Sequence, residues 1–213
     1  MGVMRGDELD RARLDSAAEV VIDLGTGDGR FVLRTARARP GALVIGVDAL
    51  AEPMEASASR AARKPARGGA ANAWFVAADA VAPPAALAGR ATLVTVNYPW
   101  GSLLRAVAAP EAEGLGAVAG LLRPGGRLVA LLNASASEDS AYAERLELPP
   151  LDGEHLRESL VPGWTAAGLE VVEARLLDPG EEPPHRTSWG QRLVRGSGRD
   201  TLLVSAVRSS ASA

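Results

Sequence analysis

The sequence predicts an α/β fold in which a mostly parallel sheet of seven strands is flanked by helices. Short apolar runs alternate with longer, Ala-rich amphipathic stretches along the 213 residues, and this alternation is typical of consecutive βαβ units. A Gly-rich turn directly follows the first apolar strand run. The length suits one domain with a sizeable core, so we expect residues 1–213 to form a single domain.

The individual elements follow from the periodicity in chain order. The strands are expected at residues 19–24, 43–47, 74–77, 92–97, 127–132, 170–176 and 202–207. The helices are expected at residues 30–37, 54–63, 103–108, 111–122 and 154–167. Gly125-Gly126 after Pro124 marks the end of a helix before the fifth strand. Residues 135–150 and 178–200 are expected to be functional loops, whereas the N-terminal extension 1–15 and residues 209–213 are expected to contribute little or to fray.

The composition excludes several classes of protein. The chain has no Cys, which excludes disulfides, thiolate zinc sites and cysteine nucleophiles. No apolar run approaches the roughly 20 residues that a transmembrane helix needs, and residues 1–15 are polar, unlike a signal peptide. We therefore expect a cytoplasmic protein with no membrane partner.

The charge distribution is more informative than the net charge of −3, which does not by itself indicate a nucleic-acid binder. Acidic residues gather between positions 138 and 158, and basic residues cluster in two other places. The two basic groups are Arg60, Arg63, Lys64 and Arg67, and Arg186, Arg192, Arg195 and Arg199. From charge alone, these groups are either solvated faces or a surface for a polyanion.

The segment 21–30, VIDLGTGDGR, combines a buried strand, a Gly-rich turn and the start of a helix. Glycines suit a tight turn that a ligand approaches closely, and the helix N-terminus favours an anionic group. In the dinucleotide-binding fingerprint the third Gly would stand one residue later. The tighter turn of Gly25, Gly27 and Gly29, with Asp23 two residues before it, resembles motif I of S-adenosylmethionine (SAM)-dependent methyltransferases. This resemblance implies SAM as the cofactor and the Rossmann-like fold of the class I enzymes.

Two further acids stand at the ends of the next two predicted strands. Asp48 is placed to accept hydrogen bonds from ribose hydroxyls, and Asp79 stands where methyltransferases often bind the adenine amino group. The alternative is that these carboxylates only cap helices, but acids at three successive strand ends favour a cofactor site. We expect that site to include Asp23, Gly25, Thr26, Gly27, Gly29, Asp48 and Asp79.

The segment 97–105, NYPWGSLLR, follows the fourth strand at the carboxyl edge of the sheet, beside the cofactor. Trp100 would lie where the methyl group is delivered, and Trp189 lies in the long last loop. Two tryptophans on opposite lips of a pocket would stack on both faces of a planar base, at about 1–3 kcal/mol per base, and enzymes that modify a base commonly extrude it first. Tryptophan is more often a packing residue, as we expect for Trp74 and Trp164. Spacing alone leaves both interpretations of Trp100 and Trp189 open.

Four segments together resemble one family across nearly the whole chain and in the same order. They are residues 23–30, 64–69 (KPARGG), 99–104 (PWGSLL) and 187–189 (TSW) with Arg192. The family is the kanamycin–apramycin resistance group of methyltransferases, which modify adenine N1 in the decoding site of 16S rRNA. The first segment is generic to methyltransferases, whereas the other three together are specific.

The resemblance implies roles for particular residues. In the family, the tryptophan of the Pro-Trp pair and the later tryptophan sandwich the flipped adenine, which implies this role for Trp100, after Pro99, and for Trp189. It implies that Asp23 and Asp48 bind SAM. Thr187 would help to organise the pocket, and with Ser188 it joins the expected cofactor-binding residues. The residues implied to contact RNA are Arg60, Arg63, Lys64, Arg67, Arg192 and Arg199. The implied partner is the 30S subunit, and we expect a monomer without a metal ion.

The chain departs from the family at two places. Asp79 is followed by residues AVAP instead of the usual Ala-Glu pair before Leu-Pro, which leaves open which group binds the SAM adenine. Asn97-Tyr98 replaces a pair whose first residue is usually apolar. Adenine N1 carries a lone pair that is mostly unprotonated at neutral pH, so methyl transfer depends on positioning and needs no general base. His155 and His185 are accordingly expected to be surface or packing residues.

Three other functions remain open from the sequence. The segment 97–100 partly resembles the Asn/Asp-Pro-Pro-aromatic motif of N6-adenine methyltransferases, with Tyr98 in place of the first Pro. A small-molecule methyltransferase would use the same fold. A non-catalytic SAM-binding or RNA-binding module is the third alternative.

Overall fold

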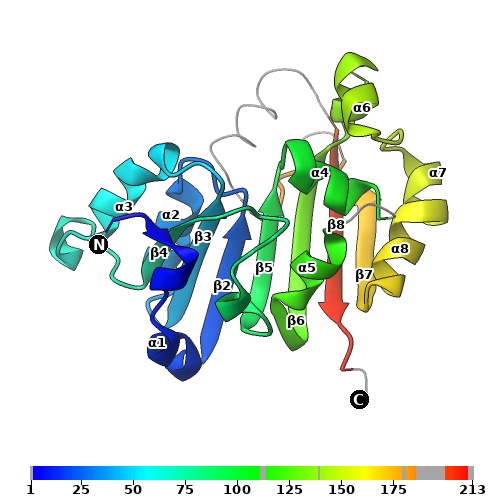
Figure 1. The fold of residues 1–213 in the computed structure, drawn as a ribbon. Coiled ribbons are helices and arrows are strands. Elements are labelled where there is room, and N and C mark those ends of the chain that lie inside the picture. The colour runs from blue at the N-terminus through cyan, green and yellow to red at the C-terminus, as the bar shows by residue number, and fades with distance from the viewer. Residues whose placement is uncertain (1, 111–113, 139, 179–180, 186–199, 211–213) are drawn as a thin grey trace.

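The computed structural model describes residues 2–110, 114–138, 140–178, 181–185 and 200–210. They form an eight-stranded sheet with the order β1-β4-β3-β2-β5-β6-β8-β7 (Figure 1). The strands are β1 (Met4–Arg5), β2 (Glu19–Leu24), β3 (Ala42–Asp48), β4 (Ala73–Ala77), β5 (Ala91–Asn97), β6 (Leu122–Asn133), β7 (Leu169–Leu176) and β8 (Thr201–Arg208). Only β8 runs antiparallel to its neighbours, β6 and β7. The predicted fold, a mostly parallel sheet flanked by helices, is confirmed.

The order of the strands explains where a ligand site forms. The strand β2 pairs in parallel with β3 on one side and with β5 on the other. The chain therefore leaves β2 toward one end of the sheet and later returns to its other side. A crevice opens at such a reversal, at the carboxyl ends of the strands, which is where the Gly-rich turn follows β2.

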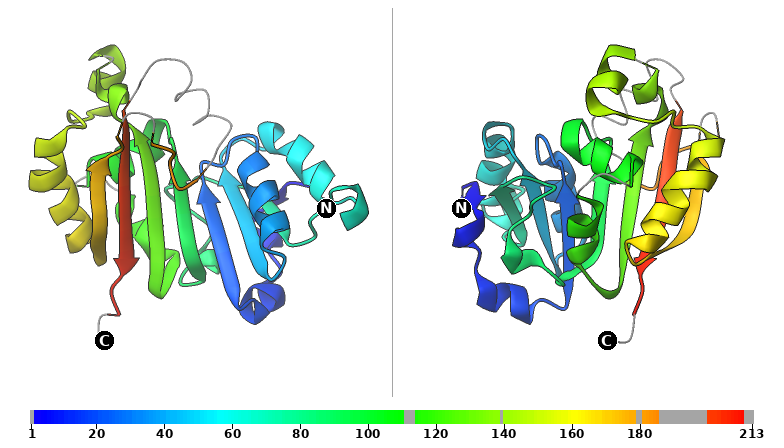
Figure 2. Two further views of the ribbon diagram at one scale, coloured as in Figure 1. Left: turned by 180° about the vertical axis from the view of Figure 1, so that it is seen from behind. Right: turned by 45° about the vertical axis from the view of Figure 1, so that its right-hand side comes forward.

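Helices cover the two faces of the sheet unequally. The helices are α1 (Arg11–Ser16), α2 (Arg30–Ala38), α3 (Glu55–Ala61), α4 (Gly101–Ala108), α5 (Leu115–Gly120), α6 (Ser140–Leu146), α7 (Gly153–His155) and α8 (Val161–Ala166). The helices α2 and α3 pack on the half of the sheet that contains β3 and β4, while α4 and α5 contact β6 and α8 contacts β7 on the other face. The rear view in Figure 2 shows α2 and α3 in front of one half of the sheet and leaves β5, β6 and β8 in plain view.

The central strands are apolar on both faces because helices or chain segments cover both. Along β2, Val21 belongs to the core under α2 and α3, and Ile22 belongs to the larger core on the opposite face. Both side chains are fully buried. This alternation follows from the two-residue period of a strand, and it explains why the sequence of β2 is a continuous apolar run rather than an alternating one.

The N-terminal residues contribute more than we expected. Met4–Arg5 pairs in parallel with β4 as an additional edge strand, so the expected seven strands become eight. Asp10 caps α1 by accepting a hydrogen bond from the backbone N–H of Arg13 (3.1 Å). Leu9 and Leu14 are buried in the main core. The expectation that residues 1–15 contribute little is therefore wrong, because apolar side chains anchor this segment to the sheet.

Two further segments differ from the expectation. Residues 135–150 are not only loop, because they contain a 3-10 turn (Ala134–Ser137) and the helix α6. The expected helix 154–167 is divided into α7, a π-helical turn (Leu156–Leu160) and α8. Pro162 lies at the start of α8 and lacks the N–H for an intrahelical hydrogen bond, which explains the local irregularity. Within the described chain, no helix has the length and apolar character that a membrane span requires.

Candidate functional site

The Gly-rich turn after β2 has a backbone that only glycine adopts readily. Gly25, Gly27 and Gly29 have φ values of 65°, 56° and 68°, in the left-handed region that side chains disfavour. The turn is tied to β3 because the N–H of Gly25 donates to the carbonyl of Val47 (2.9 Å). A Cβ at Gly29 would lie 2.5 Å from the ring of Phe75. Gly29 is also the N-cap of α2, so the free N–H groups of that helix begin at the turn.

Asp23, at the end of β2, is the most buried acid of the site, with 2% of its surface exposed. The hydroxyl of Thr95 donates to its Oδ1 (2.6 Å), and Nδ2 of Asn97 donates to the same oxygen (2.9 Å). Both donors lie on β5, the neighbour of β2. Burial raises the pKa of Asp23 to about 6, although these hydrogen bonds oppose the effect.

The other two acids already bind backbone groups. Asp48 accepts hydrogen bonds from the N–H of Gly27 (2.8 Å) and of Leu50 (3.0 Å). It therefore connects the end of β3 with the Gly-rich turn. Asp79 is exposed and accepts a hydrogen bond from the N–H of Val81 (3.0 Å). Each carboxylate keeps further acceptor capacity, because an ionised carboxylate has about four lone-pair sites.

The turn and its acids fit the groups that SAM carries. A Cβ at Gly27 would meet no atom within 4 Å, so there is open space beside the turn. The buried hydroxyl of Thr26 makes no hydrogen bond of good geometry among the described residues, although it lies close enough to Asp23 to lower the pKa of that acid. An ammonium group and ribose hydroxyls need acceptors, which Asp23 and Asp48 supply, and a carboxylate suits the N-terminus of α2. SAM is the methyl donor that these residues would hold.

Residues 97–100 do not present the Asn-Tyr pair to a ligand. Nδ2 of Asn97 donates to Asp23, whereas its Oδ1 is buried and makes no hydrogen bond among the described residues. Tyr98 has a left-handed φ of 52°, its ring is buried, and its hydroxyl lies 3.2 Å from the Oγ1 of Thr201. The N6-adenine interpretation needs an amide oxygen that the base can reach, and the burial of Oδ1 of Asn97 gives it no support.

Trp100 differs from the tryptophans that pack in the core. Its exposed fraction is 50%, whereas Trp74 and Trp164 are fully buried, as we expected. Pro99 is buried next to it, and Trp100 is the N-cap of α4. A Cβ at Gly25 would lie 2.9 Å from Cδ2 of Leu103 on the first turn of α4. The helix that begins after Trp100 therefore packs directly on the Gly-rich turn.

Tyr142 is a site residue that the sequence analysis missed. Its ring is steeply inclined to that of Trp100, with 5.4 Å between the centroids and an interplanar angle of 67°. Its hydroxyl accepts a hydrogen bond from the N–H of Gly101 (2.9 Å). The chain has only two tyrosines, and this scarcity could have drawn attention to Tyr142. It was missed because residues 135–150 were expected to be loop, which gives no position for their side chains.

The first basic group forms one exposed patch around a tight turn. Arg60 lies on α3, and Arg63, Lys64 and Arg67 follow it; all four are exposed. A Cβ at Gly69 would lie 1.6 Å from the carbonyl oxygen of Arg63, so this turn requires glycine. No ion pair involves these four cations among the residues that the structure describes. The remaining expected site residues, Thr187, Ser188, Trp189, Arg192 and Arg199, lie outside the described residues.

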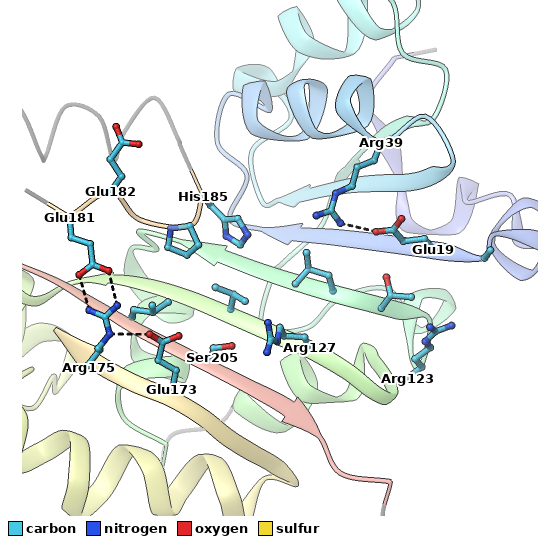
Figure 3. Close-up of a pocket in the computed structure, with 16 residues that line it drawn as sticks. Glu19, Arg39, Arg123, Arg127, Glu173, Arg175, Glu181, Glu182, His185 and Ser205 are labelled. Carbon is cyan, nitrogen blue, oxygen red and sulfur yellow. Dashed lines mark hydrogen bonds and ion pairs between the residues drawn. The ribbon is translucent and has the colours of Figure 1, made fainter. Parts of the chain in front are cut away.

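A cavity of about 740 Å³ lies over the part of the sheet that α2 and α3 leave uncovered (Figure 3). Several of its charged side chains pair with one another. Arg39 binds Glu19 (2.8 Å), and Arg175 binds Glu173 (3.0 Å) and Glu181 (2.7 Å). None of its lining residues belongs to the Gly-rich turn or to the three acids. The cavity is therefore separate from the expected cofactor site.

Both histidines have packing roles, as we expected. His185 lies at the edge of this cavity, and its ring packs against that of Phe31, with 5.5 Å between the centroids. Burial lowers the pKa of His185. The Nε2 of His155 lies 2.7 Å from the carbonyl oxygen of Ala108 at the end of α4.

Comparison with known proteins identifies the family. The family model described as NpmA, 16S rRNA (adenine(1408)-N(1))-methyltransferase, matches residues 3–208. The 16S rRNA (adenine(1408)-N(1))-methyltransferase of Streptoalloteichus tenebrarius is 37% identical over 187 residues, which cover 87% of this chain and 85% of the relative. The crystal structure of the antibiotic-resistance methyltransferase Kmr is 46% identical, covers all of both chains and has a TM-score of 0.80.

A third comparison concerns the cofactor. A mutant of the 16S rRNA (adenine(1408)-N(1))-methyltransferase from Catenulisporales acidiphilia, solved with the cosubstrate SAM, is 34% identical. The match covers 98% of this chain and 97% of the mutant's chain, with a TM-score of 0.84. The resemblance drawn from the sequence is confirmed, and the chain belongs to the family of 16S rRNA (adenine(1408)-N(1))-methyltransferases.

Proposed function

We propose that this protein transfers the methyl group of SAM to N1 of the decoding-site adenine of 16S rRNA within the 30S subunit, and thereby confers aminoglycoside resistance. One structural observation carries the proposal beyond family membership. The half-exposed Trp100 stands at the start of α4, and α4 packs on the Gly-rich turn through Leu103. A large exposed aromatic surface thus lies beside the Gly-rich turn, which supports its assignment to a base next to the methyl donor.

The mechanism depends on positioning. SAM, when bound, would supply an electrophilic methyl group and leave as S-adenosylhomocysteine when its S–CH3 bond breaks. Adenine N1 would supply the lone pair for the new bond and take the positive charge, so no protein group has to remove a proton. Asp23 would accept from the ammonium end of the cofactor, and Asp48 would accept from its ribose hydroxyls. The exposed indole of Trp100 stacks on one face of the adenine and holds N1 toward the methyl donor. We assign the other face of the base to Trp189, with Thr187 and Ser188 organising the pocket.

The target base has to leave its stack before it enters this pocket. The basic patch of Arg60, Arg63, Lys64 and Arg67 supports docking on RNA, because its cations are exposed and surround the tight turn at Gly69. Such contacts bind phosphates and position the enzyme without reading the sequence. Arg192 and Arg199 complete the proposed RNA surface. We further propose that the protein acts in the cytoplasm, as a monomer and without a metal ion.

A transfer assay with tritiated SAM tests the substrate. Purified 30S subunits, naked 16S rRNA and a panel of small-molecule acceptors are compared at equal enzyme concentration. The proposal predicts incorporation of one methyl group per 30S subunit. It also predicts that expression in a susceptible bacterium raises the inhibitory concentrations of kanamycin and apramycin. Incorporation into a small molecule only, or no incorporation at all, would contradict it.

A further inference from the structure

Tyr142 connects α6 with the segment that carries Trp100. Its ring packs edge-to-face against the indole, with 5.4 Å between the centroids, and its hydroxyl accepts a hydrogen bond from the N–H of Gly101 (2.9 Å). One side chain thus contacts the ring of Trp100 and fixes the backbone of the next residue. Gly101 has a φ of 57°, so this hydrogen bond lies at the bend where β5 ends and α4 begins.

The segment of Tyr142 is itself held against α4. Just after α6, Glu147 adopts a left-handed φ of 50° and forms an ion pair with Arg105 on α4. The guanidinium of Arg145 lies 5.3 Å from the centroid of the Tyr142 ring. These contacts near the C-terminal end of α6 therefore help to fix the position of Tyr142 relative to the start of α4.

An exposed indole needs such a support if it is to bind a base. Half of the surface of Trp100 is open to solvent, and an unsupported exposed side chain loses rotamer entropy on binding. Edge-to-face contacts between aromatic rings have a preferred geometry, so the contact with Tyr142 limits the orientations of the indole before the base arrives. The planes of the two rings meet at 67°, so Tyr142 is not stacked parallel to the indole.

We propose that Tyr142 is a positioning residue that holds the Trp100 indole in the orientation in which the target adenine stacks. This inference rests on the proposed function, because it assumes that Trp100 binds the base. Tyr142 acts on the Trp100 indole, directly through the ring contact and indirectly by fixing the backbone of the next residue, Gly101. It thereby makes α6 part of the base pocket.

The test combines single and double variants in the 30S methylation assay. Y142A is expected to lower kcat/KM about tenfold, because both the ring contact and the hydrogen bond are lost. Y142F keeps the ring and is expected to lower it about threefold. E144A is the matched control, since Glu144 is exposed on the same helix, and it should be unchanged. The Kd for SAM, measured by calorimetry, should stay within about twofold of wild type in all three.

The double variant W100A/Y142A separates positioning from general stability. If Tyr142 acts through Trp100, the double variant loses no more activity than W100A, whereas independent effects would multiply. Multiplying losses, an unchanged kcat/KM in Y142A, or a SAM Kd weakened in parallel would each overturn the inference. Wild type that does not methylate 30S subunits would instead refute the proposed function. Normal activity of W100A would refute the base-binding role on which Tyr142 depends.

Discussion

Asn97 and Asp23 are joined by a hydrogen bond of 2.9 Å from Nδ2 to Oδ1, across the two strands at which the sheet order reverses. Thr95 donates to the same oxygen. The carboxylate is therefore fixed in orientation through Oδ1, and Oδ2 receives neither of these bonds. The amide of Asn97 therefore contributes directly to the environment of the cofactor-site acid.

The first prediction concerns pH. Asp23 has a pKa raised to about 6, and its ionised form is the one that accepts from the SAM ammonium. As pH falls through 6, protonation removes this acceptor, so the Kd for SAM should rise, by about tenfold between pH 7.5 and pH 5. Calorimetric titration across this range measures the midpoint. D23N should bind weakly and show no such midpoint, and a flat wild-type profile would contradict the assignment of Asp23.

In the protein without SAM, the raised pKa of Asp23 has the opposite effect: a lower pH weakens SAM binding but makes the fold more stable. The pKa of Asp23 is higher in the folded state than its ordinary value of 3.8, so the native state takes up this proton first as pH falls. This group therefore makes the free energy of unfolding rise as pH decreases from about 7 toward 4. Denaturant unfolding of wild type and D23N should show the difference: the contribution is absent in D23N.

The second prediction isolates Asn97. N97L removes a donor to the charged carboxylate, which raises the pKa of Asp23 further. The midpoint of the SAM-binding profile should therefore shift to higher pH than in wild type, and the affinity at pH 7 should fall. N97L with an unshifted midpoint would show that the hydrogen bond does not control the ionisation of Asp23.

The third prediction concerns Trp100. W100A should lower methylation of 30S subunits by at least about tenfold, because stacking on the base is lost, and should leave the Kd for SAM within about twofold of wild type. W100F should retain part of the activity because it keeps an aromatic face. An equal loss of SAM affinity in W100A would refute a role confined to the base.

The fourth prediction tests the basic patch. Replacing Arg63, Lys64 and Arg67 with Ala should weaken 30S binding and reduce the salt dependence of that binding by about one unit of slope per lost phosphate contact. SAM affinity should be unaffected. If the salt dependence does not change, the patch is a solvated surface and does not contact RNA.

The fifth prediction concerns the Gly-rich turn. G29A should destabilise the protein by more than about 1 kcal/mol, because the left-handed φ of 68° is unfavourable for Ala and its Cβ would approach Phe75 to 2.5 Å. SAM binding should be lost as well. G116A is the matched control, since Gly116 lies within α5 with open space at its Cβ, and Ala should stabilise that helix slightly. Thermal unfolding of both variants makes the comparison, and equal Tm values would contradict it.

Local patterns were sufficient for the central elements of the fold and for the cofactor turn. The strand β2 has the bounds expected from its apolar run, and the spacing of Gly25, Gly27 and Gly29 identified the turn correctly. The edge strand Met4–Arg5 was missed because two residues carry no periodicity, and its pairing with β4 depends on residues about 70 positions away. A pattern within a few neighbouring residues cannot show which distant strands pair.

The long-range contacts of the site were missed for the same reason. Asn97 and Asp23 are 74 residues apart, and the sequence marked Asn97 only as a departure from the family. Tyr142 lies 41 residues beyond Gly101, to which it binds. The sequence indicated which residue types carry the chemistry, and the sheet order determined which of them meet.

Primer extension across the decoding site of 30S subunits, after incubation with the protein with and without SAM, tests the central claim most directly. Methylation at N1 blocks the Watson–Crick edge, so reverse transcriptase should stop beside the target adenine only when SAM is present, and the stop should be strongly reduced with W100A. A methyl group incorporated into 30S subunits without a stop at this adenine would contradict the claim, because the enzyme would then modify another atom or another base.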